Sequence, residues 1–218
     1  GFIKKACISD NIASVIDLYF SAPASYDVLS AWVGVTFASV QVYCDFSGYS
    51  DMAIACAALL GYQLRENFYF PFFARDITEL WRRWHMTLSR FLRVYLYIPL
   101  GGNRRGFFRR YVNILITMLL GGLWHGAGWN FLIWGGLHGF YLIINHIWQI
   151  LWSIFGKKNR KLTSFGVFSA RVVTFIAVVI GWVVFRAETL TGALIFYEGM
   201  LGFNGFSLPV QLANKIVF

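Results

Sequence analysis

The chain has 218 residues, of which 58% are hydrophobic, 19% are aromatic and only 13% are charged. A soluble domain of average composition carries about 25% charged residues, so this composition excludes an ordinary soluble domain and is typical of a protein whose surface meets lipid. Basic residues gather in the cytoplasmic loops of membrane proteins, and the net charge of +9 is therefore interpreted as that bias and not as a nucleic-acid-binding surface. The three cysteines form no CxxC motif and predict neither a disulfide framework nor a zinc site.

Long uncharged stretches indicate the fold class. Residues 111–156 contain no Asp, Glu, Lys or Arg. At about 1.5 Å per residue this stretch is long enough for two helical passes of a hydrocarbon core about 30 Å thick. Residues 28–44 and 172–185 are also uncharged. The sequence predicts an all-α, multi-pass transmembrane helix bundle with interfacial and broken helices around a cavity, because irregular backbone is tolerated at membrane depth only where protein or water covers it.

The remaining segments are arranged around these stretches. The chain opens on Gly1 without an initiator Met or a signal-peptide pattern, and we expect it to be part of a longer protein. We predict a single membrane domain, 1–218, whose segments are an interfacial amphipathic helix at 1–27, membrane segments at 28–64, a basic cytoplasmic or interfacial region at 65–110, two membrane helices at 111–156, a basic loop at 157–167, a membrane helix at 168–186 and an amphipathic tail at 187–218. The positive-inside rule predicts that the basic stretches 104–110 and 157–161 both face the cytoplasm.

A polar stretch, DFSGYSD, interrupts the first membrane region and carries Asp45 and Asp51. We expect it to end one membrane segment, with the apolar residues after it forming a second and shorter one. Carboxylates at membrane depth are costly unless they are paired or line a wet cavity. We therefore expect both carboxylates to be bonded to Ser47, Tyr49 or an arginine of the region 75–93.

The basic region is expected to hold one long helix, from Thr78 to about Tyr97, with Thr78 as its N-cap. Its tryptophans, leucines and other aromatic residues would form one stripe, and its arginines would lie largely off that stripe. Such a basic, aromatic helix is typical of a segment that lies along the cytoplasmic face of a membrane.

The uncharged pair of helices is expected to run from Asn113 to about His125 and from 131 to 154, joined by a tight glycine connection at 126–128. About 18 Å of helix separates Asn113 from His125, so this histidine lies inside a hydrocarbon layer about 30 Å thick if the helix starts near the inner boundary. Two interpretations of His125 stay open from the residues alone. It is either a functional histidine or an incidental one at a glycine-mediated helix contact.

Three further histidines have weaker signals. His85 lies among arginines and tryptophans in the basic region, and its alternative interpretation is an interfacial histidine bonded to a headgroup or a backbone carbonyl. His138 and His146 are interpreted as structural residues of one apolar helix. No HExxH, GxSxG, glycine-rich phosphate loop or Cys–His pair occurs, so the sequence predicts no metal centre and no protein nucleophile.

Four ordered segments carry a family resemblance: DFSGYSDMAI at 45–54, LWRRWHMTLSRFLR at 80–93, YLYIPLGGNR at 95–104 and GLWHG at 122–126. They resemble motifs of the membrane-bound O-acyltransferase family, and in particular of its alginate O-acetylation branch. The resemblance extends from residue 1 to about 205 and corresponds to the second half of that family. Val94 stands where the family usually has an aspartate, and Ala55 stands where a glycine is more usual.

The resemblance implies that His125 and His85 are the catalytic residues of a site in which a hydroxyl attacks an acyl thioester. A neutral imidazole can take the hydroxyl proton in the transition state, so neither a metal nor a bound cofactor is expected. The substrate and cavity positions that the resemblance adds are Trp124, Asn130, Arg82 and Asp45.

The resemblance also implies the reaction and its setting. An acetyl group would pass from a cytoplasmic donor, acetyl-CoA or an acyl carrier, toward hydroxyls of an exported polysaccharide in alginate-type O-acetylation. The protein would be a multi-pass protein of the bacterial inner membrane, with extracytoplasmic polysaccharide-acetylation proteins as partners. The alternatives are D-alanyl or other acyl transfer to cell-wall polymers, a proton-coupled transporter that uses His125, Asp45 and Asp51, and a non-catalytic membrane scaffold.

Overall fold

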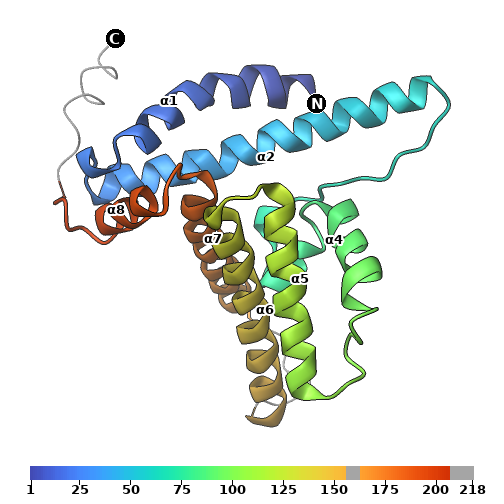
Figure 1. Cartoon of the computed structure of the whole chain (residues 1–218). Coiled ribbons are helices and arrows are strands. Elements are labelled where there is room, and N and C mark those ends of the chain that lie inside the picture. The colour runs from blue at the N-terminus through green and yellow to red at the C-terminus, as the bar shows by residue number, and fades with distance from the viewer. Residues whose placement is uncertain (156–162, 207–218) are drawn as a thin grey trace. The chain divides into compact units, whose positions relative to one another are not determined.

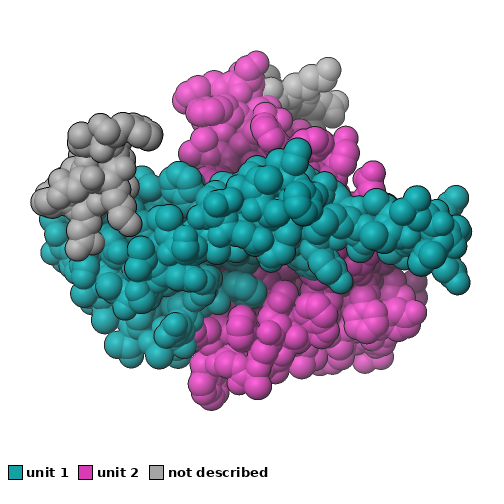
Figure 2. Space-filling view, turned by 90° about the horizontal axis from the view of Figure 1, so that it is seen from above, with its two compact units in different colours: residues 1–64, 182–218 teal, residues 65–181 magenta. Residues whose placement is uncertain are grey.

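A computed structural model describes residues 1–155 and 163–206. Within these ranges all regular structure is helical and no strand occurs, which confirms the predicted all-α class (Figure 1). The described residues fall into two compact units, coloured separately in Figure 2. Unit 1 comprises residues 1–64 with those from 182 onward, and unit 2 comprises residues 65–181.

Unit 1 is built on one long helix, α2 (Val28–Leu59). The π-helix η1 (Ile3–Ser9) and α1 (Asp10–Ser21) run beside it, and η2 (Pro23–Ser25) turns the chain back (Figure 1). The last helix, α8 (Leu190–Met200), also packs on α2. The helix α2 starts where it does because the Asp27 side chain accepts a hydrogen bond from the Ser30 amide at 2.8 Å, which is N-cap geometry.

The prediction that the polar stretch 45–51 ends a membrane segment is wrong, because α2 continues through it without a break. The carboxylates are paired, as expected, but with lysines of η1. Lys5 Nζ lies 2.5 Å from Asp45 Oδ1, and Lys4 Nζ lies 2.9 Å from Asp51 Oδ2. Since the neighbouring helix supplies these partners, the backbone of α2 keeps its own hydrogen bonds.

By length and composition, α2 and α7 (Ser164–Arg186) are the candidate membrane spans among the described residues. The helix α7 begins four residues before the predicted 168, so residues 164–167 are helical and not part of a loop. The basic stretch 157–161 and the end of the predicted tail, from residue 207, lie outside the described residues.

Unit 2 contains the hairpin of α5 (Phe107–His125) and α6 (Trp129–Phe155), the most extensive helix pair in the described chain (Figure 1). The predicted end at His125 and the predicted glycine connection are confirmed, although α5 begins before the expected Asn113. The two helices approach closely because glycines face each other at their crossing. A Cβ atom added at Gly122 would lie 2.2 Å from the Phe131 carbonyl oxygen, and one added at Gly135 would lie 2.3 Å from that of Met118.

The single helix predicted from Thr78 to Tyr97 is wrong. The chain instead forms η3 (Pro71–Phe73), α3 (Ile77–Trp81), α4 (Met86–Leu92) and the π-helix η4 (Arg93–Tyr97). The N-cap of α3 is Asp76, whose carboxylate accepts from the Glu79 amide at 2.8 Å, and not Thr78. The helix is interrupted because residues 67 and 69 form hydrogen bonds with backbone groups that a continuous helix would use. The Tyr69 amide donates to the Arg83 carbonyl at 2.9 Å, and the Met86 amide donates to the Asn67 carbonyl at 3.0 Å.

Candidate functional site

His85 lies at the break between α3 and α4, with 7% of its surface exposed. Its φ of 43° is in the left-handed region, which non-glycine residues adopt at a cost and which is typical of residues held by their surroundings. The Trp84 ring next to it is anchored edge-on against Phe68 at a centroid distance of 5.0 Å. The break therefore holds the backbone of His85 in one conformation.

Asn67 makes a polar contact with this histidine. His85 Nδ1 lies 3.2 Å from Asn67 Oδ1. The same oxygen accepts from the Thr87 amide at 3.2 Å and from the Thr87 hydroxyl at 2.9 Å. The sequence analysis did not single out Asn67, and its only sequence signal is its place in the polar, aromatic stretch before Pro71.

His125 is the last residue of α5, and its ring contacts two tryptophans. The Trp124 ring lies 5.0 Å from the His125 ring, and the Trp134 ring of α6 lies 5.2 Å from it on an edge-to-face approach. The glycine crossing of α5 and α6 brings Trp134 to this position, because Gly135 leaves room for the α5 backbone.

The structure brings the two predicted catalytic histidines together. The His85 ring lies 5.8 Å from the Trp124 ring, so one tryptophan contacts both imidazoles. Burial, together with a smaller effect of the nearby His125, lowers the pKa of His85 to about 4. His85 is therefore neutral at physiological pH and has a ring nitrogen that can accept a proton.

His138 belongs to the same cluster of rings. It packs 4.7 Å from the Trp134 ring and 5.4 Å from the Trp81 ring, with 3% of its surface exposed. A Cβ atom added at Gly181 would lie 3.1 Å from His138 Nε2, so α7 also packs closely on this imidazole. This placement agrees with the structural role expected of His138.

The other predicted site residues are Trp124, Asn130, Arg82 and Asp45. Trp124 lies at the site with 61% of its surface exposed, and Asn130 lies in the first turn of α6 and is partly exposed. Arg82 is exposed in the break beside His85. Asp45 lies in unit 1 and is paired with Lys5.

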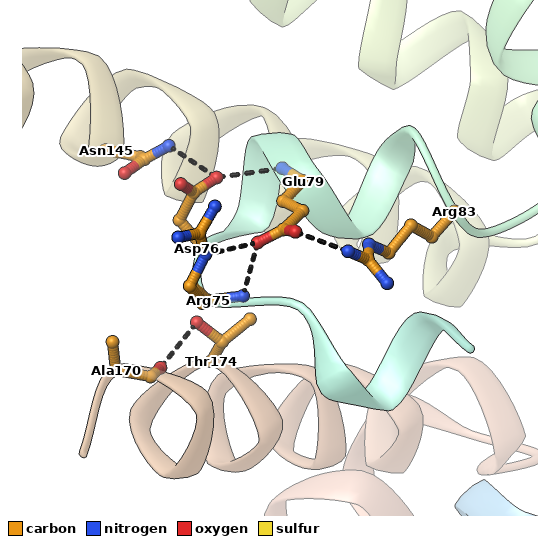
Figure 3. Close-up of polar contacts among 7 residues, drawn as sticks. All are labelled: Arg75, Asp76, Glu79, Arg83, Asn145, Ala170 and Thr174. Atoms are coloured by element: carbon orange, nitrogen blue, oxygen red, sulfur yellow. Dashed lines mark hydrogen bonds and ion pairs between the residues drawn. The ribbon is translucent and has the colours of Figure 1, made fainter. Parts of the chain in front are cut away.

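An ionic network holds α3 beside the break (Figure 3). Glu79 accepts from the Arg75 amide at 2.8 Å, from Arg75 Nε at 3.2 Å and from Arg83 Nη2 at 2.6 Å. Asn145 Nδ2 of α6 donates to Asp76 Oδ1 at 3.3 Å and to Thr78 Oγ1 at 2.8 Å. These bonds link residues of the segment before the break to one another and to α6.

Replacing Glu79 with Gln should lower the stability of this segment by about 1 kcal/mol at neutral pH, because an ionised acceptor of three bonds is lost. Partial burial alone would raise the pKa of Glu79, but the bonds from Arg75 and Arg83 lower it overall. The stabilisation is therefore present above the usual pKa of 4.5 and is lost as pH falls through the lower folded pKa.

Thermal unfolding of the full-length protein in detergent measures this effect at several pH values. The gap between wild type and Glu79→Gln should be widest near neutral pH and close at acidic pH. Glu66→Gln, at an exposed position, is the matched control and should leave the transition unchanged. A gap that does not narrow on acidification would contradict the assignment.

A separate cavity of about 810 Å³ lies between α6 and α7. Its walls are largely aromatic and aliphatic, with Trp148, Trp152 and Val173 among them, and Asp76 and Asn145 are among its polar lining residues. Tyr141 lines the cavity and also packs 5.7 Å from the His138 ring, so the cavity borders the cluster of rings that contains His125. The described residues hold no group of three or more His, Cys, Asp or Glu side chains that could bind a metal ion.

Comparison with known proteins places these residues in context. A model of the membrane-bound O-acyltransferase family matches residues 1–185. The chain is 46% identical over 210 residues to the "Probable alginate O-acetylase AlgI" of Azotobacter vinelandii, a match that covers 95% of this chain and 40% of that protein. It is 43% identical over 208 residues to the peptidoglycan O-acetyltransferase of Helicobacter pylori, covering 95% of this chain and 38% of that one.

A third relative is more distant. The teichoic acid D-alanyltransferase of Streptococcus thermophilus is 34% identical over 128 residues, which cover 56% of this chain and 31% of that protein. The chain thus spans about 40% of the length of the alginate relative it matches. The matches confirm the resemblance that the four sequence motifs indicated.

Proposed function

The chain belongs to the membrane-bound O-acyltransferase family, and from this premise we propose that it forms the part of a membrane O-acetyltransferase that carries the site of acyl transfer. The observation that carries the proposal is the pair of histidines, His85 and His125, which come from segments far apart in the chain and contact one tryptophan. The names of the relatives support acetyl transfer to polysaccharide hydroxyls.

The proposed reaction is a direct transfer with His125 as general base. The acceptor hydroxyl oxygen bonds to the thioester carbonyl carbon while the imidazole takes the hydroxyl proton. The carbon–sulfur bond then breaks, and the departing thiolate takes the proton from the imidazolium. His85 lies across Trp124 from this centre and is held neutral by burial, which suits a residue that accepts or orients a hydrogen bond at the reacting groups.

The donor and the acceptor are proposed on chemical grounds. A thioester, acetyl-CoA or an acyl carrier, would approach from the cytoplasm, and the acceptor would be an exported polysaccharide of the alginate kind. The complete protein would be a multi-pass protein of the bacterial inner membrane that works with extracytoplasmic polysaccharide-acetylation proteins. Acyl transfer to another cell-wall polymer stays the alternative, since one relative is a D-alanyltransferase.

The contacts of Asp45 and Asp51 support proton-coupled transport less well than acyl transfer. Such a transporter would need Asp45 and Asp51 to exchange protons during its cycle. Each is instead paired with a lysine, Lys5 and Lys4 respectively, and a proton-exchange cycle would have to break these ion pairs.

The cytoplasmic orientation of the basic loop before α5 has its own test. In a cysteine-free version of the full-length protein, a cysteine introduced by Arg105→Cys should not react with a membrane-impermeant maleimide added to intact cells. It should react once the inner membrane is permeabilised, because basic loops stay on the cytoplasmic side. Labelling in intact cells would contradict the orientation and, with it, a cytoplasmic donor.

Acyl transfer is tested with cells that lack their own polysaccharide O-acetyltransferase. The full-length protein, expressed together with extracytoplasmic polysaccharide-acetylation proteins, should restore ester-linked acetate on the exported polymer. A polymer without added ester in cells that contain the protein in their membranes would overturn the proposed function.

A further inference from the structure

The contacts of Asn67 determine which nitrogen of His85 carries the proton. Three groups converge on one oxygen of the Asn67 amide: His85 Nδ1, the Thr87 backbone amide and the Thr87 hydroxyl. A backbone N–H can only donate, so the atom it contacts must be the amide oxygen and not the amide nitrogen. The orientation of the Asn67 side chain is thus fixed without reference to the histidine.

An amide oxygen accepts hydrogen bonds and cannot donate them. His85 Nδ1, at 3.2 Å from this oxygen, must therefore carry the hydrogen and donate it. In a neutral imidazole the other nitrogen, Nε2, then holds the lone pair. The contact thus selects one of the two tautomers.

The backbone supports the same arrangement. The Met86 amide donates to the Asn67 carbonyl at 3.0 Å, and the Tyr69 amide donates to the Arg83 carbonyl at 2.9 Å, on either side of His85. These bonds hold the histidine at its φ of 43° and keep the Asn67 side chain against it. The amide contact and the left-handed backbone are consequently parts of one local structure.

We propose that Asn67 is a positioning residue that fixes His85 as the Nδ1–H tautomer, so that Nε2 is the nitrogen offered to the acyl-transfer site. The proposal rests on the proposed function and adds to it the atom through which His85 acts. Nε2 then accepts a hydrogen bond from a hydroxyl or thiol of the reacting groups. Without Asn67, His85 would divide between two tautomers and orientations.

The decisive variant is Asn67→Asp. A carboxylate accepts the same three bonds, so the local geometry is kept, but its negative charge raises the pKa of His85. His85 then becomes protonated at a higher pH, and the acidic limb of the pH–rate profile should move upward by about one pH unit or more. His125 is a titratable group whose charge acts on His85. Arg83 is bonded to Glu79, and Arg82 is exposed.

The profile is measured as acyl transfer in membranes containing the full-length protein. Asn67→Leu should lower the rate by about 10- to 100-fold, and Asn67→Asp should recover most of it at high pH. Asn103→Asp is the matched control, because Asn103 accepts from a tyrosine hydroxyl and contacts no histidine, and its profile should match wild type. An Asn67→Asp profile identical to wild type, while His125→Gln is inactive, would overturn the positioning role and leave the proposed function standing. Full activity of both variants would overturn the function itself.

A spectroscopic measurement tests the tautomer without activity. In ¹⁵N-histidine-labelled full-length protein at neutral pH, the signals lost in His85→Gln should be one protonated Nδ1 and one unprotonated Nε2. A protonated Nε2 at His85 would contradict the proposal, whatever the rates of the variants.

Discussion

Replacing His125 with Gln is expected to lower acylation by about 10²- to 10⁴-fold while the protein stays folded and inserted. Gln keeps polarity and similar length but takes no proton at neutral pH, so it should be nearly as damaging as Ala. The reason is positional, because His125 ends α5 between Trp124 and Trp134 and shares Trp124 with His85. The measurement is the ester-linked acyl content of the polymer, normalised to the amount of full-length protein in the membrane.

The control for this variant is His146→Gln. His146 is only partly buried, and its ring contact is with Tyr111 at 6.4 Å, away from the tryptophans of the site. His138 is unsuitable as a control, because it is enclosed by rings and by Gly181, and its replacement would disturb the packing around His125. Near-normal acylation by His125→Gln, with a membrane level equal to wild type, would show that this histidine only packs.

The second large effect is expected at the crossing of α5 and α6. Gly122→Ala and Gly135→Ala each place a methyl group against backbone, 2.2 Å from the Phe131 oxygen and 2.3 Å from the Met118 oxygen. A backbone carbonyl cannot rotate away, so the helices must separate. Overpacking of this kind costs about 1–3 kcal/mol.

These variants should reduce the yield of monodisperse full-length protein in detergent and lower its unfolding temperature. Activity should fall further than yield, since Trp134 moves away from His125 when the crossing opens. Gly136→Ala is the matched control on the same helix, because its methyl group would meet only the Leu119 Cδ2 atom at 3.3 Å, the end of a flexible side chain. Equal stability of Gly135→Ala and Gly136→Ala would contradict the close approach of the two helices.

Some of this architecture follows from local sequence. The uncharged stretch with a glycine-rich connection predicts the α5–α6 hairpin, and the end of α5 at His125 is confirmed. The hairpin itself implies that a residue about one turn into α6 returns to the level of His125, and Trp134 is such a residue. That signal was present in the sequence but becomes specific only once the helix crossing is known.

Other features depend on contacts between distant segments, and the sequence pattern could not reveal them. Residues 80–93 have the composition of a continuous helix, yet hydrogen bonds from residues 67 and 69 divide it at His85. Conversely, the polar stretch of α2 resembles a break but stays helical, because Lys4 and Lys5 of η1 neutralise its carboxylates. In both places partners supplied from elsewhere in the chain decide the backbone conformation. Asn67 was missed for the same reason.

The central claim is that His85 and His125 act in one acyl-transfer site. Its most direct test is the rate at which membranes with the full-length protein move a labelled acetyl group from a thioester donor to polysaccharide hydroxyls. The variants compared are His85→Gln, His125→Gln and the double variant. We predict that His125→Gln is slower than wild type by about 10²-fold or more and that adding His85→Gln lowers the rate little further, as for residues that work as a unit. A wild-type rate in His125→Gln, or losses that multiply in the double variant, would contradict the claim.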